Sequence, residues 1–371
     1  MASFSQIGNE LYTGRRSIDF IGRRKLWFTV GALLMVASVL VLAIRGINPG
    51  IEFRGGSQFT VSGASTTAQE PANQVLADLG AGEPPRVSAV GSDSVRVQTE
   101  RLTNEETTEV QGALAEAYDV PPENVAATFV GPSWGADVTG KALQGLLLFL
   151  VIITVGMSLY FRTWTMALGA VGALLHDLVV TVGVYAAVGF EVTPASVIGF
   201  LTILGYSLYD TVVVFDKVRE NNADLYTQDK RTYAEGSNLA VNQTLVRSIN
   251  TSVTGLLPVA AILFVGAFLL GAGTLRDIAL ALFVGMLLSS LSSVFLAAPL
   301  EVALRERNEA VVKHTKMVLD RRERRRAAAG ETGDGGAVDL GARTEDLTGV
   351  GIVAGHHLGT AAQPRRRKKG R

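Results

Sequence analysis

Six long apolar runs dominate the pattern of hydrophobic and polar positions along the chain. The first, residues 26–44, contains no charged residue, and similar runs lie at about 142–160, 166–188, 194–215, 248–271 and 278–300. A helix needs about 20 apolar residues to cross a hydrocarbon core of about 30 Å. The pattern therefore predicts six transmembrane helices, the first at 26–46 and the other five within a helical bundle at 139–304.

The polar segment 47–138, between the first two predicted spans, has the pattern of a small α/β domain. Thr103 and Glu106 have capping-box spacing at the start of a helix-like stretch, and Gly55-Gly56 marks a bulge or kink in the first strand-like stretch. Strands are expected at 51–61, 86–90, 94–100 and 124–131, and helices at 66–80 and 103–118. The order βαββαβ predicts a ferredoxin-like domain. The fold class is thus a polytopic α-helical membrane protein with six transmembrane helices and an external ferredoxin-like domain.

Basic residues beside the spans predict the orientation of the chain. Five of them precede the first span and four follow the last, namely Arg15, Arg16, Arg23, Arg24, Lys25, Arg305, Arg307, Lys313 and Lys316. Short flanks rich in lysine and arginine stay in the cytoplasm. Both termini are therefore expected to be cytoplasmic, as an even number of spans requires, and the polar domain 47–138 is expected to lie outside.

Three further segments are expected on the cytoplasmic side. They are the N-terminal segment 1–25, a charged and partly helical loop at 217–245, and a basic tail at 305–371 that we expect to be largely disordered. The basic runs at 321–326 and 365–369 could attract anionic lipid or ribosomal RNA. A solvated tail that enforces the topology is the favoured interpretation, and nucleic acid is not expected as a partner.

Composition narrows the function classes. Of 371 residues 48% are hydrophobic, and the 34 basic and 34 acidic residues give no net charge. The mean hydropathy of +0.29 is too high for an ordinary soluble enzyme. The absence of cysteine excludes disulfides and thiolate metal sites, and no GxxxxGK[ST] loop is present to bind nucleotide. No cofactor or metal is expected. The first apolar run exceeds the hydrophobic region of a signal peptide, about 7–15 residues, so we interpret it as a retained anchor.

Two ionisable residues in the predicted spans are expected to meet. Asp210 lies about six residues, or roughly 9 Å, from the cytoplasmic end of the fourth span. Arg247 lies where the fifth span begins on the same side. On the fourth span, Tyr206 and Ser207 share a helical face with Asp210. On the fifth span, Asn250, Thr251 and Thr254 share a face with Arg247. These stripes predict that Asp210 and Arg247 can come together within the bundle.

Two interpretations of this pair stay open. A static ion pair could hold two helices together, or Arg247 could reach toward the lipid headgroups. Alternatively, the pair is a proton-responsive switch, because burial and a nearby arginine act in opposite directions on the protonation of Asp210. His176 and Asp177, near the middle of the third span, are candidates for a secondary relay of protons or for a structural pair with satisfied hydrogen bonds. The small residues at 285–299 are interpreted as helix packing.

Four sequence motifs resemble those of one family. They are GIEFRGG at 50–56, ALLHDLVVTVG at 173–183, ILGYSLYDTVVVFDKVREN at 203–221 and NQTLVRSINTSVTGLLP at 242–258. In this order they are similar to the motifs of SecF, the smaller subunit of the SecD–SecF accessory complex of bacterial protein export. The first motif includes Phe53, Gly55 and Gly56. Glu52 and Tyr209 stand where the family commonly has other polar residues. The resemblance covers about residues 15–305.

The resemblance implies a function and partners. SecF proteins are related to exporters of the resistance-nodulation-division type, and the acid and the arginine that match Asp210 and Arg247 are held to serve proton coupling. It implies a multi-pass protein of the bacterial plasma membrane that acts with SecD, the SecYEG channel, a translocating preprotein and membrane lipids, with YajC as a further candidate partner. It implies no enzymatic activity.

Two other functions compete with this one. The first is half of a proton-coupled exporter of lipids or small molecules. The second is an intramembrane aspartyl protease, because Tyr209-Asp210 resembles the YD motif of such enzymes. That chemistry needs a second membrane aspartate, and the usual GxGD companion is missing, since Asp177 stands in an HD pair instead.

Overall fold

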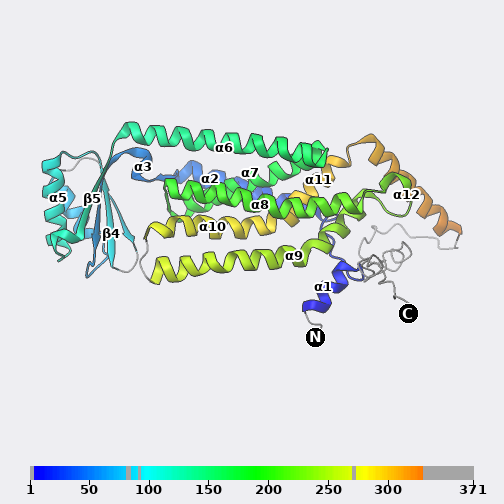
Figure 1. Cartoon of the computed structure of the whole chain (residues 1–371), viewed down its shortest axis with the longest axis horizontal. Helices are drawn as coiled ribbons and strands as arrows, with labels where there is room; N and C mark the ends of the chain where they lie inside the picture. Colours follow the sequence, from blue (N-terminus) through cyan, green and yellow to red (C-terminus); the bar gives the residue numbers. More distant parts are fainter. Residues whose placement is uncertain (1–3, 81–84, 91–92, 270–272, 329–371) are drawn as a thin grey trace, which may run out of the picture.

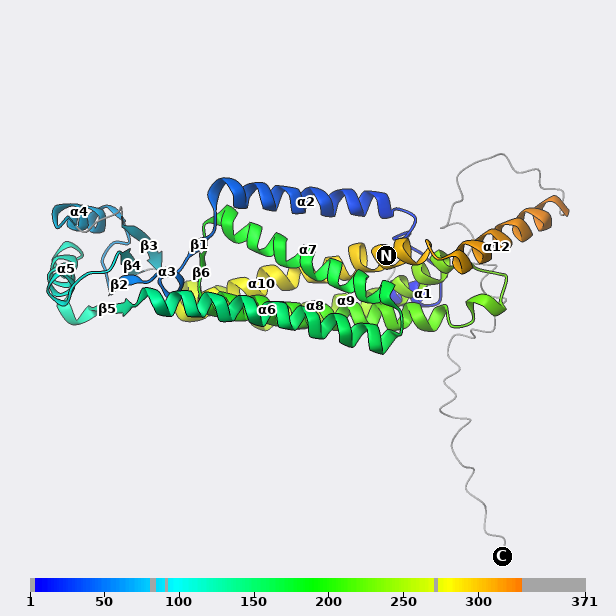
Figure 2. The same cartoon turned by 90° about the horizontal axis from the view of Figure 1, so that it is seen from above.

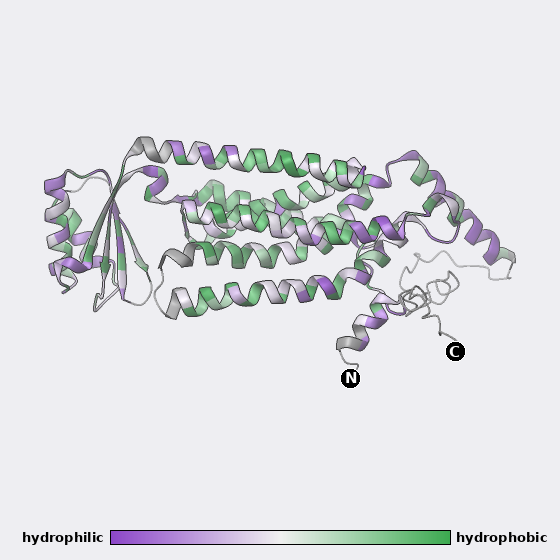
Figure 3. Ribbon diagram, viewed as in Figure 1, coloured by the Kyte–Doolittle hydropathy of each residue, from purple (hydrophilic) through white to green (hydrophobic). Residues whose placement is uncertain are grey.

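Long helices run side by side along the length of the molecule, and a small α/β domain lies at one end of them (Figure 1). The computed structural model describes residues 4–80, 85–90, 93–269 and 273–328. In this part of the chain, six helices are long and apolar enough to cross a membrane. The prediction of six spans is therefore confirmed. Figure 3 shows the apolar residues concentrated along these helices and the polar residues at both ends.

The helices of the bundle have the following bounds. The first spans are α2 (Arg24–Arg45), α6 (Pro132–Phe161), α7 (Trp164–Val188) and α8 (Pro194–Asn221). The fifth is α9 (Tyr233–Ala261), which continues as the π-helix η3 (Ile262–Leu269), and the sixth joins α10 (Gly273–Ser292), the π-helix η4 (Ser293–Ala297) and α11 (Ala298–Arg305). The middle of the bundle is formed by α7, α8 and the sixth span, whereas few residues are buried in the most apolar stretches of α2, α6 and α9. Figure 2 shows α2 along α7 at one side of the bundle.

Two of these helices extend beyond the apolar runs that predicted them. The fourth span continues as a helix to Asn221, and the fifth begins at Tyr233, where Thr232 and Glu235 form a capping box. The predicted loop at 217–245 is therefore mostly helix, and only residues 222–232, with the short turn η2 (Leu225–Thr227), connect the two helices. The apolar pattern marks where lipid contact ends, whereas the helix ends at its capping residues.

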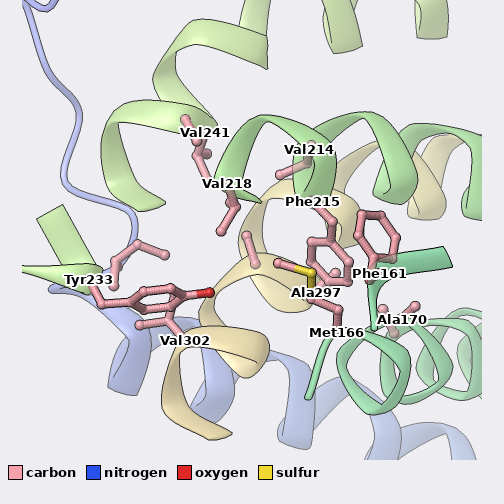
Figure 4. Close-up of a cluster of buried hydrophobic side chains, with 14 of the residues drawn as sticks. Phe161, Met166, Ala170, Val214, Phe215, Val218, Tyr233, Val241, Ala297 and Val302 are labelled. Atoms are coloured by element: carbon pink, nitrogen blue, oxygen red, sulfur yellow. The ribbon is translucent and has the colours of Figure 1, made fainter. Parts of the chain in front are cut away.

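The end of the bundle away from the α/β domain has its own apolar core. Phe161, Met166, Phe215, Tyr233 and Val302, from five different segments, belong to one cluster of buried side chains (Figure 4). The N-terminal helix α1 (Phe4–Tyr12) packs against α9 at this end. Phe20 and Ile21, which follow α1, join the same core. This packing holds the helices together where Asp210 and its neighbours lie.

The α/β domain has the predicted ferredoxin-like order. Its strands are β2 (Gly56–Ser62), β3 (Arg86–Val90), β4 (Ser94–Thr99) and β5 (Val125–Val130), and its helices are α4 (Glu70–Asp78) and α5 (Asn104–Ala117), with the turn η1 (Pro122–Asn124) before β5. The strands form one antiparallel sheet in the order β3-β4-β2-β5. Phe59 and Val97 face each other across β2 and β4 and are buried with Leu76 and Leu114 of the two helices. This arrangement is the split βαβ plan.

The expected strand at 51–61 is wrong in its first half. Residues Ile51–Arg54 form the short helix α3, and β2 begins only at Gly56. Gly55 and Gly56 have φ angles of 79° and 125°, which residues with a side chain rarely adopt. A Cβ at Gly56 would lie 2.3 Å from the carbonyl oxygen of Thr99. The two glycines therefore turn the chain from α3 into the sheet.

The α/β domain and the segment that leads into it contact the loop between α7 and α8. The strand β1 (Asn48–Pro49), which follows α2, pairs in parallel with β6 (Glu191–Val192), between α7 and α8. In addition, Arg96 of β4 forms an ion pair with Glu191 over 2.8 Å, and both side chains are largely buried. The domain is thus attached to the loop between the third and fourth spans as well as to its own flanking helices.

The start of the predicted disordered tail is a helix. The helix α12 (Glu309–Ala328) contains the basic run 321–326, and Arg322 contacts Glu235 of α9 over 2.6 Å. The expectation of disorder is therefore wrong for residues 309–328, because this segment has partners on the bundle. The rest of the tail, including the basic run 365–369, lies outside the described residues.

Candidate functional site: two buried carboxyl groups in the bundle

Small residues on α8 bring its polar face against the sixth span. A Cβ at Gly199 would lie 2.7 Å from the Cβ of Ala281 on α10, so only glycine allows this approach. Ser196, Ser207 and Asp210 are buried on α8. A charged or polar side chain buried in this way needs hydrogen-bond partners on the neighbouring helices.

Asp210 is held by two serine hydroxyls from two other helices. The side chain is 4% exposed. Ser248 Oγ of α9 donates a hydrogen bond to Asp210 Oδ1 over 2.8 Å, and Ser293 Oγ of η4 donates to Asp210 Oδ2. Tyr206, one turn earlier on α8, lies within electrostatic range of the carboxyl group. The carboxyl group therefore connects the fourth, fifth and sixth spans.

Asp177 has the same kind of environment on the third span. It is fully buried, and its Oδ2 accepts hydrogen bonds from Ser207 Oγ of α8 over 3.0 Å and from Ser292 Oγ of α10 over 2.6 Å. His176 Nδ1 lies 3.3 Å from Asp177 Oδ1. The two residues, although adjacent on the helix, do contact each other. Each of the two buried aspartates is thus held by two serines. We call these side chains together the carboxyl network.

His176 also faces the first span. Its Nε2 is buried and has no hydrogen-bond partner among the described residues, and it lies next to Gly31 of α2. This position is compatible with both predicted roles of His176 and Asp177, a proton relay or a structural pair. Nδ1 of His176 contacts Asp177, and Nε2 can still donate or accept a hydrogen bond.

Arg247 does not contact Asp210. Its Nη2 lies 3.4 Å from Tyr209 Oη, and both side chains are exposed. No ion pair joins Arg247 to Asp210 in the described part of the chain. Successive residues of an α-helix point about 100° apart, so the face of α9 that meets Asp210 carries Ser248, and Arg247 points to the exposed side. The expected meeting of the pair is therefore absent from this conformation.

Other predicted site residues lie on either side of this network. Asn250 is exposed, and Thr251 is half-buried, on the same side of α9 as Arg247. Phe53, Gly55 and Gly56 lie at the junction of α3 and β2, between the bundle and the sheet (Figure 1). They position the α/β domain and do not belong to the carboxyl network.

Sequence reasoning missed several members of the site. Ser292 and Ser293 belong to the segment 285–299, which was interpreted as helix packing, and Ser248 was not singled out, although a hydroxyl within an apolar span also signals a polar neighbour. Glu301 was not singled out either. It is 1% exposed, and its Oε1 accepts from Tyr233 Oη over 2.8 Å and from Thr165 Oγ1 over 3.3 Å. An acid directly after the apolar run that ends at residue 300 was the available signal.

The site consists of carboxyl, hydroxyl and imidazole groups only. Among the described residues, no three His, Cys, Asp or Glu side chains come together in a group that could hold a metal ion. The groups present can accept, donate and exchange protons. The arrangement therefore suits the binding and transfer of protons inside the membrane.

Comparisons with known proteins identify the family. The family model "Protein export membrane protein SecD/SecF, C-terminal" matches residues 110–307, and the model "SecD/SecF GG Motif" matches residues 40–65. The protein translocase subunit SecF of Streptomyces coelicolor is 42% identical over 371 residues, which cover 100% of this chain and 98% of that protein. SecF of Mycobacterium tuberculosis strain H37Rv is 41% identical over 367 residues, covering 96% of this chain and 83% of that protein.

A solved structure has the same fold. The crystal structure of SecDF, described as a translocon-associated membrane protein from Thermus thermophilus, matches with a TM-score of 0.70 and 30% sequence identity. The match covers 78% of this chain and 39% of that chain, so this chain corresponds to less than half of the solved protein. From the four sequence motifs, the two family models and the full-length similarity to SecF proteins, the chain belongs to the SecF group of the SecD/SecF family of protein export membrane proteins.

Proposed function

We propose that this chain is an accessory subunit of the Sec protein-export machinery that acts with SecD and uses the proton motive force to promote late polypeptide translocation. The observation that carries the proposal is the environment of Asp210. Its carboxyl group is buried in a membrane span and is held by two hydroxyls, and no cation of the described residues forms a hydrogen bond with it. Intramembrane acids of this kind mark proton pathways by default.

Protonation of Asp210 would change the contacts of three helices. A carboxylate only accepts hydrogen bonds, whereas a protonated carboxyl group also donates one. Ser248 and Ser293 donate to the two oxygens of Asp210, so a proton on either oxygen requires the serine beside it to turn its own proton away or to accept instead of donate. One charge that crosses the membrane potential carries about 2.3 kcal/mol per 100 mV. That energy is comparable to the hydrogen bonds that would be exchanged.

Arg247 is the cation nearest in sequence to this network, and we propose that it serves proton coupling from a second conformation. In the present conformation, Arg247 contacts Tyr209 instead of Asp210. A rotation of α9 that exchanges Ser248 for Arg247 would bring a positive charge to the carboxylate, which charge attraction favours when Asp210 is deprotonated.

Support for SecD as a partner comes from an exposed polar face. Arg247, Asn250 and Thr254 of α9 and Tyr209 of α8 are exposed within helices long enough to span the membrane. Polar groups facing lipid are costly, so this face suits a second membrane protein. The relative from Thermus thermophilus is named SecDF, and the match covers 39% of its length. We therefore propose SecD on this face. SecYEG, YajC and the preprotein are proposed from the family resemblance alone.

The orientation proposed from the basic flanks puts both termini in the cytoplasm and the α/β domain outside the plasma membrane of a bacterium. In that orientation, movements of the bundle reach the domain through β1–β6 and through Arg96–Glu191. We propose that the domain contacts the emerging polypeptide. A role in the export of lipids or small molecules has less support, because the curated relatives are named protein translocase subunits.

The test compares Asp210→Asn with Ser290→Ala in cells that lack the native protein. Asparagine keeps the size of the side chain and removes its titration. Ser290 lies on the sixth span, as Ser293 does, but its hydroxyl donates to the carbonyl of Met286 on its own helix. We expect Asp210→Asn to abolish the part of secretion that depends on the proton gradient and Ser290→Ala to retain it. Normal gradient-dependent secretion by Asp210→Asn, at wild-type protein levels, would contradict the proposal.

A further inference from the structure

Two adjacent serines on the sixth span contact two different buried carboxyl groups. Ser292 Oγ donates to Asp177 Oδ2 over 2.6 Å, and Ser293 Oγ donates to Asp210 Oδ2. Because successive residues of a helix point about 100° apart, one dipeptide can reach both the third and the fourth span. All four side chains are at most 5% exposed.

The two carboxyl groups have separate sets of hydrogen bonds, which together involve four membrane spans. Asp177 of α7 also accepts from Ser207 of α8, over 3.0 Å, and Asp210 of α8 also accepts from Ser248 of α9, over 2.8 Å. The dipeptide Ser292-Ser293 is the point at which these two sets of contacts meet on one backbone segment. A displacement of this segment therefore alters both carboxyl groups together.

Each of the two serines has a second acceptor on its own helix. Ser292 Oγ lies 3.3 Å from the carbonyl oxygen of Ser289, and Ser293 Oγ lies 3.4 Å from that of Ser290. A hydroxyl has one proton to donate, so each serine donates either to its carboxylate or to its own helix. When a carboxyl group gains a proton, it becomes a donor itself, and the serine can turn to the carbonyl.

The backbone changes its geometry at the same point. The α-helix α10 ends at Ser292, and the π-helix η4 begins at Ser293. Single-turn π segments within α-helices occur frequently at functional sites, because they alter the hydrogen bonds of the helix backbone. The two serines thus lie where the helix is already irregular.

Few other ionisable groups face these carboxyl groups. His176 Nδ1 contacts Asp177 from the same helix, and Tyr206 lies within electrostatic range of Asp210. From α9, Arg247 is next to Ser248 in sequence but contacts Tyr209. No other charged side chain forms a hydrogen bond or an ion pair with either carboxyl group among the residues that the structure describes.

We propose that Asp177 is a second proton-binding site and that Ser292 and Ser293 are positioning residues that couple its protonation to that of Asp210. The proposal rests on the proposed proton-binding role of Asp210. A proton at one carboxyl group releases one serine, shifts the Ser292-Ser293 segment, and changes the hydrogen bonds offered to the other. The proton affinity of each carboxyl group then depends on whether the other is protonated. By thermodynamic linkage, Asp177 affects Asp210 as much as Asp210 affects Asp177.

The experiment follows the carboxyl bands of the full chain, purified and reconstituted in lipid vesicles, by infrared difference spectroscopy during a pH titration. The band that disappears in Asp210→Asn is assigned to Asp210, and the band that disappears in Asp177→Asn to Asp177. The informative variant is Ser292→Ala, which removes a contact to Asp177 and none to Asp210. Ser290→Ala is the matched control, because its hydroxyl contacts only its own helix.

We expect Ser292→Ala to change the proton affinity of Asp210 by about fivefold or more, the lower end of usual coupling between sites, and Ser290→Ala to leave it unchanged. If Asp210 titrates but with the same midpoint in Ser292→Ala as in the wild type, the coupling is overturned and the proton-binding role of Asp210 stands. If no titrating band is lost in Asp210→Asn, both are overturned. Should Ser292→Ala fail to fold, Asp177→Asn is used in its place, and the same shift at Asp210 is expected.

Discussion

Arg247 and Ser248 are neighbours on α9 and contact two successive residues of α8, Tyr209 and Asp210. Ser248 Oγ lies 2.8 Å from Asp210 Oδ1, whereas Arg247 Nη2 lies 3.4 Å from the hydroxyl of Tyr209, the residue before Asp210. One face of α9 therefore stabilises a buried acid with a neutral donor, and the next face keeps a cation at the surface of the bundle. A rotation of α9 by about 100° about its axis would exchange the two.

Replacing Ser248 by alanine is expected to destabilise the bundle. The change removes a donor to a buried carboxyl group, and hydrogen bonds between membrane helices contribute about 1–2 kcal/mol in model peptides. The loss is measured as a lower free energy of unfolding in detergent. Ser252→Ala is the control, because Ser252 Oγ donates to the carbonyl of Ser248 on its own helix. An equal decrease in the free energy of unfolding in both variants would show that the hydrogen bond from Ser248 to Asp210 does not stabilise the bundle.

Replacing Arg247 by methionine is expected to leave folding intact and to impair export. Arg247 is exposed and contacts only the neutral hydroxyl of Tyr209, so the free energy of unfolding should change by no more than about 0.5 kcal/mol. Secretion that depends on the proton gradient should fall strongly, because no cation is left to meet the deprotonated Asp210. Unfolding of the variant would instead favour a static ion pair as the role of Arg247.

The variants of Glu301 test whether its hydrogen bonds stabilise the end of the bundle away from the α/β domain. Glu301→Ala leaves the hydroxyls of Tyr233 and Thr165 without their acceptor, which should lower the free energy of unfolding by about 1–3 kcal/mol. Glu301→Gln keeps an oxygen at this position and should cost less. Because Tyr233→Phe removes one of the two donors, its effect should be smaller in the Glu301→Ala background than in the wild type. Additive effects in this double-mutant cycle would contradict a direct contribution of the bond.

The first helix turn of α5 is expected to lose stability in acid. The backbone N–H of Thr103 donates to Glu106 and lowers the pKa of this carboxyl group from its ordinary value of 4.5. A pKa that is lower in the folded than in the unfolded state gives stability that is present above the unfolded value and is lost as the pH falls through the folded one. Hydrogen exchange at the start of α5 should therefore be protected above pH 4.5 and increase below it. In Glu106→Gln, the protection against hydrogen exchange at the start of α5 should no longer show this dependence on pH.

The fold could be predicted from the sequence because lipid and sheet impose strong periodicities. Apolar runs placed the six spans, and alternation with one capping box placed most elements of the α/β domain, which the structure confirms. The ends of α8 and α9 were missed, because a helix that leaves the membrane loses its apolar signal but keeps its backbone hydrogen bonds. The segment Ile51–Arg54 was missed because its apolar residues fit a strand as well as a single helical turn.

The site could be predicted only in part. Asp177 and Asp210 were evident because acids are rare in apolar spans. The choice between Arg247 and Ser248 as the partner of Asp210 depends on the rotation of α9 about its axis, and a one-residue error moves the predicted contact by about 100°. Ser292 and Ser293 were hidden, because serine is also a common packing residue between membrane helices.

Translocation in a reconstituted system tests the central role of Asp210 most directly. Vesicles that contain this chain, SecD and SecYEG are supplied with a preprotein whose transfer has been started and then halted, and a proton gradient is imposed. We predict that the gradient increases completed transfer with the wild-type chain and has no effect with Asp210→Asn, while transfer without a gradient is equal in both. An equal response of Asp210→Asn and wild type to the gradient would contradict the account.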